Sequence, residues 1–218
     1  MEDLIFYIQN TALCTEYVSA LLGMYYFRKY RRTSLKIFVY LLLYAALNEI
    51  LCVVLLKYDF LRIVNVLYNI YIFINFICIY SIFYKVLKRK AHTSIVKFAM
   101  SIYIILFISF SWYENYLLQY QNIPYLVGAT FVILSVGLYF SEVLNSSKVL
   151  RIKENALFWI SIGWLLFFVG NIPFWVVRNY YDNLGEQTYL FLIILILGII
   201  MNILFWIGLK WGNKKYQY

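Results

Sequence analysis

Two glutamates lie inside long apolar segments of this chain, where a charged group needs a physical reason. Glu49 is near the middle of the run 41–56, and Glu16 is in an earlier apolar stretch. An ionised carboxylate at the centre of a bilayer costs roughly 2.5–3.5 kcal/mol on insertion scales, so such a residue faces a protein interior or a water-filled cavity. Each glutamate is therefore either a structural carboxyl bonded to a neighbouring helix or a group that handles protons or contacts a ligand.

Small residues on the same helical faces indicate where these acids point. Ala45 and Ala46 precede Glu49 by one helical turn, and Ala12 stands in the same relation to Glu16. Residues three or four apart share one face of a helix, and small side chains let another helix approach closely. We therefore expect both carboxylates to face the interior of a helix bundle.

Amide side chains also interrupt the apolar segments. A single intramembrane amide is more often a helix–helix contact than a ligand contact, because such hydrogen bonds average ~0.6 kcal/mol in double-mutant cycles. Several of these amides nevertheless fall in the same half of the predicted membrane domain as Glu49, with Glu16 nearby. The pattern predicts a polar cavity close to the outer surface, whose candidate ligand-binding residues are Glu49, Glu16, Asn48, Asn65, Asn69, Asn75, Asn171 and Asn202.

Enzyme chemistry receives little support from the sequence. No nucleophile elbow, zinc-protease motif or glycine-rich phosphate loop occurs, and the single histidine, His92, lies in a basic loop. We predict no catalytic residue, no metal site and no cofactor. Acid–base work on a lipid by Glu16 and Glu49 would require that the two carboxylates be close together and reachable by water.

The composition identifies a membrane protein. Of 218 residues, 64% are hydrophobic and only 13% are charged, whereas soluble domains are about a quarter charged. A helix needs about 20 apolar residues to cross a bilayer. We predict one all-α domain over residues 1–218, a bundle of seven transmembrane helices that span residues 5–27, 35–56, 62–87, 95–112, 124–144, 155–177 and 189–211.

Basic residues alternate between the two ends of these spans. Most of the 19 Lys and Arg residues fall in the first, third and fifth loops and the C-terminal tail, and the other side holds only Lys57, Arg62 and Arg178. The positive-inside rule places the basic side in the cytoplasm, so the N-terminus is outside the plasma or inner membrane and the C-terminus inside. The net charge of +9 is thereby assigned to orientation and to contact with anionic lipid headgroups, and nucleic acid is not needed as a partner.

Weak internal similarity suggests a parallel repeat. Gly23 and the three residues after it resemble the four residues from Gly137, and Asn75 in the third span has a counterpart in Asn202 of the seventh. Spans one to three and five to seven would then be equivalent, with span four as the connector. This 3+1+3 arrangement resembles the SWEET-type sugar facilitators, which also run N-out and use an Asn on the third and seventh helices. The prolines of those carriers are absent here.

These features leave three functional hypotheses open. We favour a small-solute carrier whose ligand binds between helices near the midplane, because that function needs nothing beyond this chain. The alternative is a membrane-embedded sensor or partner subunit that binds a small molecule from outside and signals through a separate membrane or cytoplasmic protein. The third is an intramembrane enzyme acting on lipid. Retinal binding is disfavoured because the only lysine of the last span, Lys210, lies at its end.

Overall fold

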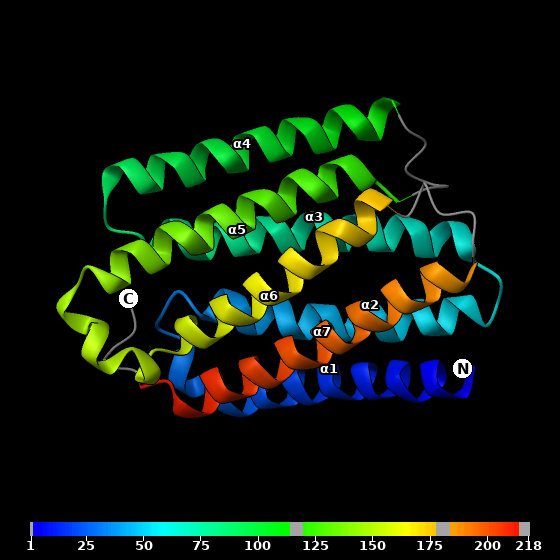
Figure 1. Ribbon diagram of the computed structural model, residues 1–218, viewed down its shortest axis with the longest axis horizontal. Helices are drawn as coiled ribbons and strands as arrows, with labels where there is room; N and C mark the ends of the chain where they lie inside the picture. Colours follow the sequence, from blue (N-terminus) through cyan, green and yellow to red (C-terminus); the bar gives the residue numbers. More distant parts are fainter. Residues whose placement is uncertain (1, 114–119, 178–183, 214–218) are drawn as a thin grey trace.

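The predicted fold class is confirmed by the computed structural model, which describes residues 2–113, 120–177 and 184–213. Within these ranges the chain forms seven long α-helices and one short 3₁₀ helix, η1, and no β-strand. The helices lie side by side, and successive helices run in opposite directions along the long axis of the molecule (Figure 1). The chain is a polytopic helical membrane protein.

The helices overlap the predicted spans and extend some of them. Helices α2 to α7 are long and apolar enough to cross a membrane, while α1 is also long but carries Gln9, Asn10 and Glu16 among its apolar residues. The bounds are α1 Glu2–Tyr30, α2 Lys36–Leu56, α3 Leu61–Val86, α4 Lys90–Tyr113, α5 Asn122–Leu144, η1 Ser147–Glu154, α6 Ala156–Val177 and α7 Leu184–Trp211.

Six of the helices form a closed ring, and α4 lies outside it. Around the ring, α1 packs on α2, α2 on α3, α3 on α5, α5 on α6, α6 on α7, and α7 on α1, whereas α4 packs on α3 and α5. Figure 1 shows α4 along one edge of the bundle. Exchanging α1–α3 with α5–α7 leaves the neighbours around the ring unchanged, as a parallel repeat with α4 as connector requires.

The two ends of the bundle differ in charge. The start of α1 and the α2–α3 connection lie at one end, here called the N-terminal end, and the α1–α2 and α3–α4 connections, η1 and the end of α7 lie at the other, the basic end (Figure 1). The basic end carries the Lys and Arg residues that predict a cytoplasmic orientation. Arg178, Lys214 and Lys215 of this charge pattern lie outside the described residues.

Aromatic side chains pack the bundle solidly toward the basic end. The rings of Phe38 on α2, Trp164 on α6 and Phe205 on α7 contact one another, with centroid separations of 4.9–6.0 Å. All three are buried. This trio, called the aromatic layer below, closes the middle of the bundle across the two three-helix halves.

Hydrogen bonds add to this closure at the basic end. The Tyr30 hydroxyl donates to the Leu209 carbonyl at 2.9 Å, and Lys29 Nζ donates to the same carbonyl at 3.1 Å. The Asn213 backbone N–H donates to the Glu154 carbonyl at 2.7 Å. These bonds join the end of α1 to the end of α7 and the chain after α7 to η1.

Gly128 allows α5 to pack closely against buried rings, so a larger side chain at this position should destabilise the bundle. A Cβ atom there would lie 2.9 Å from the Phe76 ring and 3.0 Å from Tyr103. Because both rings are buried, Gly128→Ala should lower the free energy of unfolding in detergent by roughly 1–3 kcal/mol. Gly137→Ala on the same helix is the matched control: nothing lies within 4 Å of its Cβ position, so it should be neutral or stabilising. Equal behaviour of the two variants would contradict the packing.

Candidate functional site

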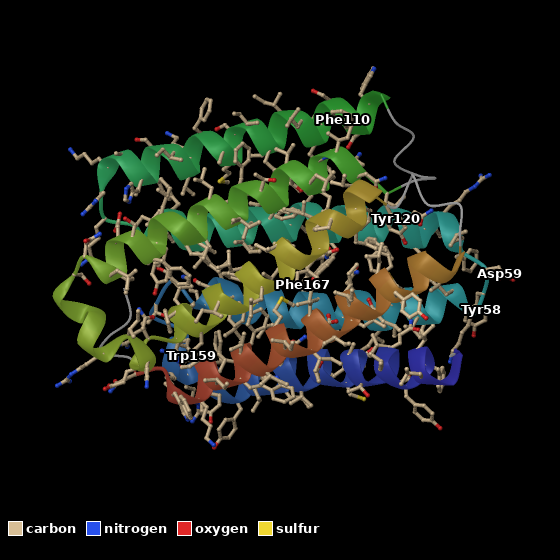
Figure 2. All side chains as sticks on the ribbon, viewed as in Figure 1. Tyr58, Asp59, Phe110, Tyr120, Trp159 and Phe167 are labelled. Carbon is tan, nitrogen blue, oxygen red and sulfur yellow. The ribbon has the colours of Figure 1, made fainter. Side chains whose placement is uncertain are left out.

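A cavity of about 760 Å³ lies inside the ring of helices. Its walls come from α1, α2, α3, α5, α6 and α7, and α4 supplies none of the described lining residues. The cavity extends from Ile5 and Tyr120 near the N-terminal end to the aromatic layer, which forms its floor. Figure 2 labels Tyr120 and Phe167, which line the cavity, and Trp159, which lies nearer the basic end.

Both predicted carboxylates line this cavity. Glu49 Oε2 accepts a hydrogen bond of 2.8 Å from the Tyr68 hydroxyl of α3. Glu16 lines the same cavity from α1. Among the described residues that line the cavity, none is Lys, Arg or His. The site therefore gathers two acidic groups in a wall that is otherwise amide, aromatic and aliphatic.

Three of the predicted amides also line the cavity, and their hydrogen bonding differs. Asn171 Nδ2 donates to the Tyr125 hydroxyl at 2.8 Å, while Asn171 Oδ1 is buried without a hydrogen-bond partner. Asn202 Nδ2 donates to the Gly198 carbonyl at 3.0 Å. The third amide, Asn75, lines the wall contributed by α3.

The Asn202 side chain fastens α7 to α1. Its Oδ1 atom lies 2.5 Å from the Ser19 hydroxyl, and Ser19 in turn accepts a hydrogen bond of 2.7 Å from the Trp206 indole N–H. Both polar atoms of Asn202 therefore have protein partners. Asn171, by contrast, has one buried acceptor, Oδ1, that no described group contacts by a hydrogen bond.

Asn48, Asn65 and Asn69 are not among the residues that line the cavity, although all three are buried. Consecutive residues of a helix point about 100° apart, so Asn48 faces a different direction from Glu49. Asn69 faces the start of α5, where its Oδ1 lies 3.4 Å from the Gln121 backbone N–H. The positions of these amides within the apolar segments indicate their depth in the membrane. They do not indicate how each helix is rotated about its own axis.

Aromatic residues form much of the cavity wall. They were not among the candidate ligand-binding residues, which were all Glu or Asn. On α3, Tyr68, Tyr71 and Ile72 line the cavity together with Asn75. Their spacing of three, four and seven residues is the signature of one helical face, so this wall could have been found from the position of Asn75. On α6, Phe168 and Trp175 line the cavity in the same helical register as Asn171.

Comparisons with known proteins add no relative: no family model, no curated protein and no solved structure matches the chain. The cavity and the residues that form it are therefore the features that indicate a function.

Proposed function

We propose that the protein is a membrane carrier for a small solute, which binds in the cavity between the two three-helix halves. The observation that carries this proposal is the convergence of Glu16, Glu49 and Asn171 on one space of about 760 Å³. Small-molecule sites typically occupy 300–1,000 Å³ and combine apolar walls with a few polar groups. The two carboxylates would be costly to keep inside a membrane without such a role.

The position of the aromatic layer supports transport rather than binding alone. Phe38 belongs to the half formed by α1–α3, whereas Trp164 and Phe205 belong to the half formed by α5–α7. Rocking of one half against the other would separate these rings and connect the cavity to the basic end. Carriers built from repeats use this kind of motion around a central site. The present arrangement corresponds to the outward-facing state if the N-terminal end is outside.

Thiol labelling tests alternating access directly. Gly198 lines the cavity, and nothing lies within 4 Å of its Cβ position, so a side chain fits there. Gly198→Cys, in a background where Cys14, Cys52 and Cys78 are replaced, should react with a membrane-impermeant thiol reagent added from the outside. Because a carrier also samples the state that is open to the other side, reagent trapped inside right-side-out vesicles should also label Gly198→Cys. This labelling should be slower than labelling from the outside.

Gly137→Cys provides the matched control, because its Cβ position is equally open and the residue does not line the cavity. It should show neither labelling pattern if it faces lipid. Labelling of Gly198→Cys from the outside alone, under all conditions, would contradict the carrier and leave a binding protein.

A sensor or partner subunit is the second candidate, and the hydrogen bonds at the basic end favour it. Helix α7 lines the cavity through Gly198 and also holds Tyr30 and Lys29 through the Leu209 carbonyl. A shift of α7 on ligand binding would therefore reach the basic surface without opening the aromatic layer. We would test this by co-purification of a partner protein and its loss when the exposed Arg28, Arg31 and Arg32 are neutralised.

A further inference from the structure

We infer that the cavity selects an amphipathic organic amine in its protonated, cationic form. This inference rests on the proposed function insofar as it assumes that the cavity binds a solute, and it names the chemical class of that solute. Three features carry it: the charge of the cavity, its unoccupied hydrogen-bond acceptor and its aromatic walls.

The charge of the cavity favours a cation. Glu16 and Glu49 both line it, and the part of the lining that the structure describes contains no basic side chain. Removing a charge from water is costly unless an opposite charge or hydrogen bonds compensate for it. Glu49 has the Tyr68 hydroxyl as a donor, which leaves carboxylate acceptor positions open. A positively charged ligand group beside Glu49 would balance its charge, and an anion would be repelled.

The amide of Asn171 favours an N–H donor on that cation. The Asn171 side chain is only 4% exposed, and its Oδ1 atom has no hydrogen-bond partner. Its Nδ2 atom is committed to the Tyr125 hydroxyl. An amide oxygen can only accept hydrogen bonds, and a buried acceptor without a donor costs roughly 1–3 kcal/mol. A protonated amine supplies the positive charge, and it would supply this donor once the Asn171 side chain turns its oxygen toward the cavity.

Aromatic rings lie beside two of these polar groups, Glu49 and Asn171. Tyr68, which binds Glu49, is 5.9 Å from the Tyr120 ring centroid to centroid, and Tyr125, which binds Asn171, is 4.8 Å from Trp175. All four residues line the cavity. Aromatic faces attract ammonium groups, with the greatest effect where water is excluded.

The depth of the cavity favours a ligand with an apolar body. Glu49 and Phe38 lie on the same helix and both line the cavity. At 1.5 Å of rise per residue, about 16 Å of helix separates Glu49 from Phe38 in the floor. The walls below the acids include Leu41, Leu42 and Met201. A ligand that fills this space has a cationic head near Glu49 and an apolar body that reaches toward the aromatic layer.

Three ligands of one skeleton and different charge test the inference. We would measure binding of diphenylpropylamine, diphenylpropanol and diphenylpropanoate to the full-length protein in lipid nanodiscs by calorimetry, with empty nanodiscs subtracted. The amine should bind about tenfold or more tightly than the alcohol, a factor that corresponds to about 1.4 kcal/mol, and the carboxylate should bind most weakly. Equal binding of amine and alcohol, or tighter binding of the carboxylate, would overturn the inference.

Charge variants locate the preference in the cavity. Glu49→Gln should reduce the amine-to-alcohol ratio to near one while alcohol binding is retained. Asp59→Asn is the matched control: it removes the same charge from a residue that does not line this cavity, and Asn tolerates the positive φ of 58° at that position. An unchanged ratio in Glu49→Gln, or an equal loss in Asp59→Asn, would overturn the assignment.

The two proposals fail separately. Charge-selective binding without thiol labelling of Gly198→Cys from the basic side would remove the carrier and keep the amine site. Two-sided labelling without a preference for the amine would keep the carrier and remove this ligand class.

Discussion

Replacement of Glu49 by glutamine is expected to abolish solute uptake while the protein still accumulates in the membrane. Without this carboxylate a cationic solute should lose its advantage over a neutral one, a fall in affinity of about tenfold or more, which corresponds to about 1.4 kcal/mol or more. Glutamine has nearly the same shape as glutamate and can still accept the hydrogen bond from Tyr68. Folding should be preserved, since a neutral amide is less costly than a carboxylate inside a membrane.

The measurement is uptake of radiolabelled diphenylpropylamine into proteoliposomes that contain equal amounts of each variant. Asp59→Asn, which Figure 2 places at the N-terminal end and which does not line the cavity, should transport as the unmodified protein does. Normal uptake by Glu49→Gln would rule out a role for this carboxylate in transport. Thermal unfolding of the same samples separates a loss of function from a loss of folded protein.

Replacement of Trp164 by alanine is expected to produce the largest loss of stability. Trp164 packs against both other members of the aromatic layer and against Phe83 at 5.9 Å, and it is only 3% exposed. Truncation of a buried Trp to Ala costs roughly 3–5 kcal/mol, because the cavity left behind is only partly refilled. In this protein the new space would join the existing cavity toward the basic end.

Two readouts distinguish this effect from general unfolding. Trp164→Ala should unfold at a lower temperature, and the Gly198→Cys thiol in the same background should become more reactive from the basic side. Trp164→Phe, which retains a ring in the layer, should keep most of the stability and the seal. Trp112→Ala is the control of equal size, since Trp112 is 94% exposed, and it should change neither readout. A sealed cavity in a folded Trp164→Ala protein would show that the aromatic layer is not the inner closure.

Some of the site could be predicted from the sequence because the cost of a charge in a membrane is local and large. Glu16 and Glu49 were identified by that cost alone, and both line the cavity. Asn171 followed from the same reasoning about depth. The aromatic walls were not predicted, because Tyr, Trp and Phe are also expected at membrane interfaces and in helix contacts, and their types do not distinguish these roles.

The sequence by itself determined the seven-helix organisation, the direction of each helix relative to the next and the charge difference between the two ends. These properties depend on the length of each apolar run and on the placement of charged residues. Both can be read directly along the chain without knowledge of how the helices pack. The tertiary structure decided the order of helices around the ring and the rotation of each helix about its own axis. That rotation brings Asn171 and Asn202 to the cavity and takes Asn48, Asn65 and Asn69 away from it. It depends on close packing between helices rather than on hydropathy, because lipid and apolar side chains are nearly equivalent surroundings for a helix face.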